Sequence, residues 1–476
     1  MLLRLIYDDV LAQAAYLIGC QRTGEAVIFD PERDIDRYLT LARKEGVRIV
    51  AAAETHIHAD FLSGVREFAE LGARAFVSGE GGADWNCRWK DKKSGEGRYD
   101  VVELRHGATF RIGNIEIKAL HTPGHTPEHM SYLVTDRGGH ADEPMGVVTG
   151  DFVFVGDVGR PDLLETAAGV AGVKEPSAKA LFASVGEFLK LPEYMQVWPA
   201  HGAGSACGKA LGAVPQSTVG YEKRFNPSIR AADGGEAAFV RAILAGQPEP
   251  PTYFARMKRE NRDGPAVLGR LPSPQALSGD ELAKRDLAGK VVVDTRPWAS
   301  FKAGHLPGAI FAPIDSMFIN VVGGYIDPQQ EIVLIAASDK LEQAVRLLVR
   351  IGLDRVTAAI DPSQVEAYAR AGGELVTTPE IDVREAARKV NDPQTFVLDV
   401  RGEGEFAEGH LPGATNIAYT RLSAELAKVP KDKQIIVNCK AGGRSARAVS
   451  YLQRLGYHAT NIEGGWMAWE QAHGAG

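Results

Sequence analysis

The 476-residue sequence has few cysteines, no long hydrophobic run and no excess of positive charge. Its four cysteines are Cys20, Cys87, Cys207 and Cys439. Their scattered positions argue against a disulfide scaffold and favour single thiols in a reducing compartment. No apolar run approaches the ~20 residues of a membrane span, and the acidic pair at 8–9 comes too early for a signal peptide. With a net charge of −7, we expect a cytoplasmic protein that binds neither nucleic acid nor membranes.

The length predicts several α/β domains, because one core seldom serves more than about 100–200 residues. Residues 1–250 alternate β-like and helical runs, and the Pro- and Arg-containing stretch 251–274 has the composition of a linker. An internal repeat follows, in which the segment from Asp294 matches the segment from Asp399 and both contain Gly-His-Leu-Pro-Gly-Ala. We therefore expect two small doubly wound α/β domains, at 275–376 and 377–476.

A cluster of metal-ligand residue types follows the apolar run that ends at Ala53. The chain reads Thr55-His56-Ile57-His58-Ala59-Asp60-Phe61. Further candidates follow other apolar runs, each beside glycine or proline, at His125, Asp151 and His201. Residues that follow strands meet at one edge of an α/β sheet, so these side chains are expected to gather there.

These motifs resemble the metallo-β-lactamase superfamily, which has an αββα sandwich, and within it the persulfide dioxygenases. The resemblance implies one Fe(II) in this domain, held by His56, His125 and Asp151. Two imidazoles and a carboxylate leave open positions for substrate and O₂. His58, Asp60 and His201 match a second metal site of binuclear relatives, but Phe61 removes a ligand there. We therefore interpret these three as residues that orient the iron ligands or as a vestigial second site.

The segment Gly156-Asp157-Val158-Gly159-Arg160-Pro161-Asp162 resembles one that lies beside the site in the same family. Arg160 and Asp162 would then help to bind substrate, because a guanidinium can pair with a carboxylate or phosphate of a thiol carrier. A structural Arg–Asp pair that braces the loop is an equally good interpretation.

The second repeat contains a glycine-rich loop between a predicted strand and a predicted helix. It reads Cys439-Lys440-Ala441-Gly442-Gly443-Arg444-Ser445. Backbone N–H groups and a helix N-terminus would lower the thiol pKa and stabilise an anionic persulfide. Four residues separate the cysteine from the arginine, whereas cysteine-phosphatase loops typically have five.

This loop resembles the active loop of the rhodanese sulfurtransferases. The resemblance implies that Cys439 and Arg444 are catalytic and that the loop residues Lys440, Gly442, Gly443 and Ser445 bind the substrate anion. The first repeat has Ala336 near the position of the cysteine, so we expect an inactive rhodanese-like domain there. We interpret Cys207, like Cys20 and Cys87, as having no catalytic role.

Together the resemblances predict oxidation of a low-molecular-weight thiol persulfide with O₂ to sulfite, followed by transfer of sulfane sulfur to give thiosulfate. Such a protein would detoxify sulfide. The thiol could be glutathione, coenzyme A or bacillithiol, and a homo-oligomer is expected. Two other hypotheses stay open: a binuclear zinc thioester hydrolase of the glyoxalase II type, and a non-catalytic sulfur carrier.

Overall fold

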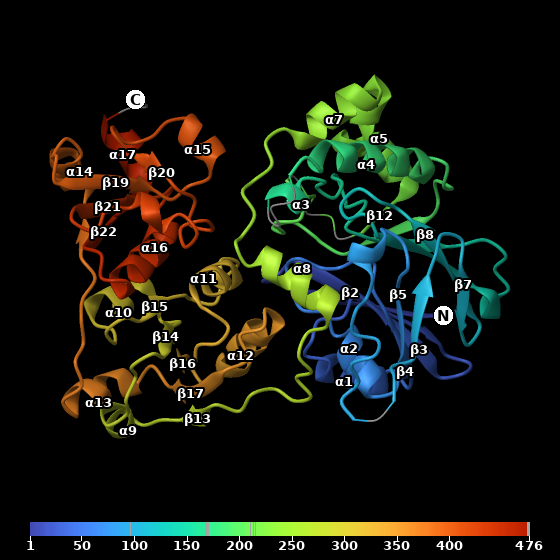
Figure 1. The fold of residues 1–476 in the computed structure, drawn as a ribbon, viewed down its shortest axis with the longest axis horizontal. Coiled ribbons are helices and arrows are strands. Elements are labelled where there is room, and N and C mark those ends of the chain that lie inside the picture. Colours follow the sequence, from blue (N-terminus) through green and yellow to red (C-terminus); the bar gives the residue numbers. More distant parts are fainter. Residues whose placement is uncertain (96, 167–170, 210, 213, 215, 474–476) are drawn as a thin grey trace. The chain divides into compact units, whose positions relative to one another are not determined.

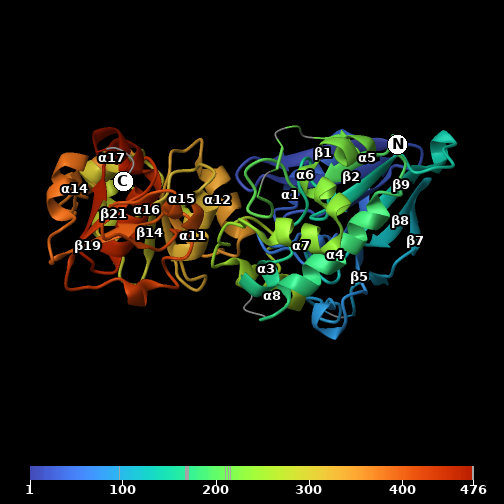
Figure 2. The same ribbon diagram turned by 90° about the horizontal axis from the view of Figure 1, so that it is seen from above.

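The computed structural model describes residues 1–95, 97–166, 171–209, 211–212, 214 and 216–473. The chain divides into two compact units (Figures 1 and 2). The first comprises Met1–Gln247 and Phe254–Arg270, and the second comprises Pro248–Tyr253 and Leu271–Gly476. Among the described residues, no helix combines the length and the apolar character needed to cross a membrane.

The first unit contains two six-stranded sheets. The strands of one sheet, in spatial order, are β1 (Leu2–Asp8), β2 (Gln13–Cys20), β3 (Glu25–Phe29), β4 (Arg48–Ala53), β5 (Arg74–Ser78) and β6 (Val101–Leu104). Those of the other are β12 (Ser217–Thr218), β11 (Gln196–Pro199), β10 (Gly146–Gly150), β9 (Met130–Asp136), β8 (Ile115–His121) and β7 (Thr109–Ile112).

Helices cover the outer faces of the two sheets. The helices of this unit are α1 (Asp36–Lys44), α2 (Val65–Glu70), α3 (Leu163–Thr166), α4 (Lys174–Phe188), α5 (Val219–Phe225), α6 (Pro227–Arg230), α7 (Glu236–Leu244) and α8 (Phe254–Asp263), with 3₁₀ turns at η1 (Ala83–Trp85), η2 (Arg137–Gly139) and η3 (Ala231–Gly234). Helices α4 and α7 lie side by side in both views (Figures 1 and 2).

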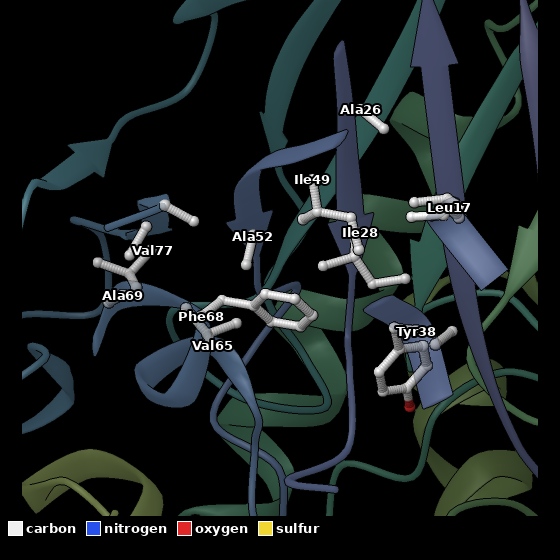
Figure 3. Packing of buried hydrophobic residues seen from close by; sticks show 14 of the residues in the cluster. Leu17, Ala26, Ile28, Tyr38, Ile49, Ala52, Val65, Phe68, Ala69 and Val77 are labelled. Carbon is white, nitrogen blue, oxygen red and sulfur yellow. The ribbon is translucent and has the colours of Figure 1, made fainter. Parts of the chain in front are cut away.

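Three apolar layers show why these elements stack as an αββα sandwich. Successive side chains of a strand point to opposite faces, and in β2 Leu17 packs toward helices α1 and α2 while Tyr16 and Ile18 pack between the sheets. In Figure 3, Phe68 of α2 points toward Ala52 and Ile28 of the first sheet. Residues of α4 and α7 bury the outer face of the second sheet. The predicted sandwich is confirmed.

The second unit contains two five-stranded parallel sheets with the same order of strands. The first is β13 (Gln275–Ala276), β17 (Val356–Ile360), β16 (Ile332–Ile335), β14 (Val291–Asp294) and β15 (Ile310–Phe311). The second is β18 (Glu380–Ile381), β22 (Ala459–Ile462), β21 (Gln434–Asn438), β19 (Thr395–Asp399) and β20 (Thr415–Asn416). The repeat seen in the sequence is therefore a repeat of topology.

Helices connect these strands, as parallel pairing requires. They are α9 (Gly279–Ala283), α10 (Trp298–Ala303), α11 (Phe318–Tyr325), α12 (Leu341–Arg350), α13 (Gln364–Arg370), α14 (Val383–Lys389), α15 (Glu403–Ala407), α16 (Gly443–Arg454) and α17 (Gly465–His473), with a 3₁₀ turn at η4 (Leu426–Lys428).

The stretch 251–274 differs from the expected linker. It contains α8, and Phe254–Arg270 belongs to the first unit. The side chains of Phe254, Met257, Lys258 and Asn261 are buried. Their spacing of three and four residues places them on one face of the helix. The charged residues that suggested a solvated linker lie mostly on the opposite face of an amphipathic helix.

Candidate metal centre and sulfur-transfer loop

The predicted metal ligands follow the carboxyl ends of strands from both sheets. His56 comes after β4, His125 after β8, Asp151 after β10 and His201 after β11. All four side chains are buried, and the structure brings them together at one edge of the sandwich. This is the gathering that the sequence predicts, and it depends on the two sheets ending at the same edge.

His56, His125 and Asp151 form a group whose ligand atoms all lie within 4.8 Å of one another. Oδ2 of Asp151 lies 3.8 Å from Nε2 of His56 and 3.5 Å from Nε2 of His125. The imidazole rings of the two histidines stand at 89° to each other. Two imidazoles and one carboxylate thus converge on a common point.

A second group consists of Asp60, His201 and Cys207, also within 4.8 Å of one another. Nε2 of His201 lies 3.4 Å from Oδ2 of Asp60 and 3.4 Å from Oδ1 of Asp151. Asp151 therefore faces both groups. Burial raises the pKa of the Cys207 thiol well above its ordinary value. The sequence interpretation overlooked Cys207, because no motif links a cysteine of this loop to the residues of the first cluster.

His58 takes no part in either group of the described residues. Its Nε2 lies 3.2 Å from Oδ1 of Asp30, and Asp30 also accepts hydrogen bonds from the backbone N–H and hydroxyl of Thr55. Burial would lower the pKa of His58, but the charge and hydrogen bond of Asp30, together with the charges of Asp60 and Glu54, outweigh it and the pKa rises to about 9. His58 thus pairs with Asp30 and anchors it against residues 54–63, which we call the motif loop. This contact fits the predicted orienting role better than a metal ligand.

The other three histidines of the centre each use Nδ1 for a contact with the protein and turn Nε2 toward the neighbouring ligand atoms. Nδ1 of His56 lies 2.9 Å from Oγ1 of Thr55, that of His125 lies 3.1 Å from the Arg160 carbonyl, and that of His201 lies 3.0 Å from the Ala12 carbonyl. Such contacts fix the tautomer and the direction of a metal-binding imidazole.

The ionisation of the centre follows from its burial. Burial and, next, the charges of neighbouring histidines hold the pKa of His56 well below its usual range, and burial does the same for His125. Both imidazoles are therefore neutral, as a ligand must be. Burial also raises the pKa of Asp151 to about 6 in the absence of a cation.

Buried polar atoms without a hydrogen-bond partner indicate whether these residues fit a metal. Among the described residues, both oxygens of Asp60 and of Asp151 and the Nε2 atoms of His125 and His201 are buried without a hydrogen-bond partner. Buried polar groups are normally paired. Six such atoms that converge on one place need a cation, and their N and O chemistry fits a divalent transition metal.

Arg160 and Asp162 form an ion pair that braces the loop, which is one of the two interpretations of the sequence. The buried guanidinium of Arg160 donates to both carboxylate oxygens of Asp162, at 3.0 and 2.7 Å, and to the Ala206 carbonyl. The backbone of the same residue holds His125. The preceding Gly159 lies so close to Asp151 that a Cβ would come within 1.7 Å of the Asp151 carbonyl oxygen. These contacts favour bracing over substrate binding.

Helix α8 contributes two buried side chains to the metal centre. The amide of Asn261 accepts from the backbone N–H of Ser63 at 2.9 Å and donates to the carbonyls of His58 and Phe61 at 2.9 and 2.7 Å. Lys258 lies near enough to His125 for its charge to add to the lowering of that residue's pKa by burial. In the sequence, the apolar residues Phe254 and Met257 at helical spacing were the signal for a buried helix face. The high charge of the segment obscured this signal.

The loop predicted to transfer sulfur closes around Cys439, directly after β21. The backbone N–H of Gly442 donates to its Sγ at 3.1 Å, and the Ser445 hydroxyl lies 3.3 Å from the same sulfur. Gly442 has φ = 92°, a conformation that few L-residues adopt. The loop thus directs one backbone N–H and one hydroxyl at the sulfur.

Contacts with Glu405 and with the segment that contains Gly465 hold the loop in place. Arg444 forms a bidentate pair with Glu405, at 2.6 and 2.7 Å, so its charge is positioned beside the loop. Lys440 and Gly443 are exposed on the loop. Gly465 packs so tightly that a Cβ would come within 2.3 Å of the Cys439 carbonyl oxygen. The next residue, Trp466, donates its backbone N–H to that oxygen at 2.7 Å.

The first repeat has the same scaffold without the reactive groups. Arg296 pairs with Asp294 as Arg401 pairs with Asp399, each through bonds of 2.7 to 3.0 Å. Ala336 follows β16 as Cys439 follows β21. The paired side chains are therefore scaffold, and the loop of the first repeat offers no nucleophile.

Two family models match the chain along most of its length. The model described as metallo-beta-lactamase superfamily matches residues 8–201, and that of the rhodanese-like domain matches 278–360 and 382–472. A crystal structure of a metallo-beta-lactamase from Staphylococcus aureus subsp. aureus COL is 40% identical, with a TM-score of 0.66, and the match covers 76% of this chain and 98% of that one. The chain belongs to the metallo-β-lactamase superfamily. Its C-terminal half consists of rhodanese-like domains.

Two further relatives match the separate parts of this superfamily member. "Persulfide dioxygenase ETHE1, mitochondrial" from Homo sapiens is 26% identical over 233 residues, or 48% of this chain and 76% of the relative. A "Sulfurtransferase" from Allochromatium vinosum is 32% identical over 97 residues, or 20% of this chain and 90% of the relative. The predicted fusion of a persulfide dioxygenase-like part with rhodanese-like domains is confirmed at the level of family, and the relatives place the chain in sulfur metabolism.

Proposed function

We propose that the protein oxidises a low-molecular-weight thiol persulfide to sulfite at a single iron and passes sulfane sulfur through Cys439 to form thiosulfate. The proposal rests on the presence of two distinct sites in one chain. One is a buried His/His/Asp group with unpaired atoms, and the other is a cysteine whose sulfur accepts hydrogen bonds from its own loop. The likeness to a persulfide dioxygenase supports the first half, and the likeness to a sulfurtransferase supports the second.

In the first site, His56, His125 and Asp151 would hold the iron. Fe(II), when bound, would provide open coordination positions for a persulfide and O₂. The contacts of Thr55 and of the Arg160 carbonyl fix the orientation of the two imidazoles, and burial favours their neutral form. The overall reaction balances as RSSH + O₂ + H₂O giving RSH and H₂SO₃.

In the second site, the thiolate of Cys439 attacks the outer sulfur of another persulfide. An S–S bond forms on Cys439, the S–S bond of the donor breaks, and the thiol leaves with a proton. Sulfite then attacks the outer sulfur on Cys439, and thiosulfate departs as the thiolate is restored. The N–H of Gly442 and the hydroxyl of Ser445 stabilise the anionic sulfur. The exposed Lys440 would provide positive charge for the anions, whereas the charge of Arg444 is balanced by Glu405.

The experiment that tests the proposal is O₂ consumption by the Fe(II)-loaded protein, with glutathione persulfide and coenzyme A persulfide in parallel. We expect uptake with at least one of them and sulfite as the product. The Cys439→Ser variant should keep the O₂ uptake and lose thiosulfate formation. Absence of uptake with every small persulfide would refute the dioxygenase half, and equal loss of both activities in the variant would refute separate sites.

A zinc thioester hydrolase is the second candidate, because Asp60, His201 and Cys207 form a further group beside Asp151. Two ions held by these two groups would supply an activated water. Phe61 argues against it, since its buried ring occupies a place in the motif where a ligand would stand. Metal analysis decides: one iron per chain supports the dioxygenase, whereas two zinc ions with hydrolysis of a glutathione thioester support the hydrolase.

A further inference from the structure

A buried lysine of helix α8 lies beside the metal centre. The side chain of Lys258 is 6% exposed. Burial lowers the pKa of Lys258, and the charges of Glu128, Cys207, Asp151 and Asp60 oppose this lowering. The charge of Lys258 also acts on His56 and His125, so its ammonium group lies near both groups of metal-ligand atoms. No motif of the metallo-β-lactamase part includes this residue, because the helix follows the matched residues 8–201.

The ammonium group has no protein partner that would explain its burial. In the part of the chain that the structure describes, Nζ of Lys258 has no hydrogen-bond partner and no carboxylate within ion-pair distance. The ring of Trp85 lies 5.5 Å from Nζ. Removing an ammonium from water costs several kcal/mol unless it is paired. An unpaired buried ammonium group beside the metal-ligand atoms therefore points to an anionic ligand.

The fold holds this lysine in place. Asn261, one turn further along α8, is bonded to the motif loop at three positions. Beyond the helix, Arg66 donates to the Pro265 carbonyl at 2.6 Å, and Arg33 donates to the Ala266 carbonyl at 2.7 Å. A helix fixed at this end cannot swing its lysine into solvent without breaking buried contacts.

Glu128 is the alternative partner for the ammonium. One of its oxygens accepts the backbone N–H of Ile57 at 2.8 Å, and the other has no partner among the described residues. Its oxygens nevertheless lie outside ion-pair distance of Nζ. Burial raises the pKa of Glu128, which weakens it as a permanent counter-charge. The charges of Asp60 and Asp151 favour the protonated lysine. A divalent ion would balance those charges, so an anionic ligand would then be needed to keep Lys258 charged.

We propose that Lys258 binds the sulfur-borne anion at the metal centre, either the ionised terminal sulfur of the persulfide or the sulfite made from it. The inference rests on the proposed function and adds a binding residue to that site. An ammonium there would draw the charged end of the substrate toward the metal ligands, whatever thiol carries it. Specificity would then lie in the charge of the terminal sulfur, and the carrier would be selected elsewhere.

The test compares three variants of the full chain, each loaded with Fe(II). Lys258→Met removes the charge and keeps the length, Lys258→Arg keeps the charge, and Arg259→Met removes a charge from an exposed position of the same helix. For each we would measure iron per chain, the KM and kcat for persulfide, and the anaerobic binding of sulfite by calorimetry. The calorimetry is done in a Cys439→Ser background, so that sulfite cannot accept sulfur.

We expect all variants to retain iron. In Lys258→Met the KM for persulfide or the Kd for sulfite should rise about 10-fold or more, as the loss of a charged hydrogen bond predicts, and the measurement that moves identifies the anion. Lys258→Arg should recover part of the loss, and Arg259→Met should match the wild type. Unchanged KM and Kd in Lys258→Met, or loss of iron from it, would overturn the inference. If the wild-type protein consumed no O₂ with persulfide, the proposed function would be refuted. The sulfite Kd of the Lys258 variants would still test the role of Lys258.

Discussion

Replacement of Asn261 by leucine tests whether α8 is a structural part of the metal centre. Leucine has nearly the same size and would leave three main-chain groups without their partner: the Ser63 N–H and the carbonyls of His58 and Phe61. Asn261 is 4% exposed, so water cannot replace the lost bonds without opening the helix.

The expected loss of stability follows from the three main-chain groups left without a partner. A buried polar group left unpaired costs about 1–3 kcal/mol. Even the lower figure gives about 3 kcal/mol for the three together, which is a large share of the stability of a domain. Because each 1.4 kcal/mol is tenfold in an equilibrium constant, openings of the motif loop should become roughly 100-fold more frequent.

Hydrogen exchange read by mass spectrometry resolves this effect peptide by peptide, which is necessary in a chain of two units. Peptides that cover 54–63 and 254–263 should exchange roughly 100-fold faster in Asn261→Leu, with peptides of the rhodanese-like domains unchanged. The protein should also lose iron to a chelator faster. Arg259→Leu, at an exposed position of the same helix, is the matched control. Wild-type exchange in Asn261→Leu would refute the assignment of α8 to this site.

Three more predictions concern other residues. The bidentate bond from Arg444 lowers the pKa of Glu405, so the stability from this pair is present above pH 4.5 and lost as the pH falls through the lowered pKa. In unfolding measured from pH 7 to pH 3.5, Glu405→Gln should therefore differ most from wild type near neutrality. Gly465→Ala should reduce sulfur transfer and leave iron binding intact, because its Cβ would displace the Cys439 carbonyl and its φ of 57° costs about 1–2 kcal/mol in alanine; normal transfer rates would contradict this packing argument. His125→Ala should abolish iron binding in elemental analysis, and a full complement of iron would exclude His125 as a ligand.

Local patterns predicted much of the fold and the positions of the main polar clusters. The repeated Gly-His-Leu-Pro-Gly-Ala segments indicated two α/β domains because each copy carries its own strand and helix signals. His56, His125 and Asp151 could be predicted to meet because each follows an apolar strand. The loop of Cys439 could be predicted because all its donors are within seven residues of sequence.

Residues whose role depends on distant contacts could not be predicted in this way. Cys207 meets Asp60 through the path of a loop, and Asn261 meets Ser63 across 198 residues. Whether Arg160 faces substrate or Asp162 depends on a rotamer, which sequence spacing does not determine. The charged composition of 251–274 favoured a linker because composition alone does not distinguish an amphipathic helix from a solvated segment.

The route of the chain between the two units has a consequence for dissecting the protein. The chain leaves the first unit at Gln247, contributes Pro248–Tyr253 to the second, returns for α8, and leaves again after Arg270. A truncation at residue 250 would remove Asn261 and Lys258 from the metal centre. A fragment that begins at residue 271 would lack Tyr253, which packs against Gly323, and Glu249, which accepts the backbone N–H of Glu403. Neither unit is a contiguous stretch of sequence, so an assay on an excised half would report on a damaged unit.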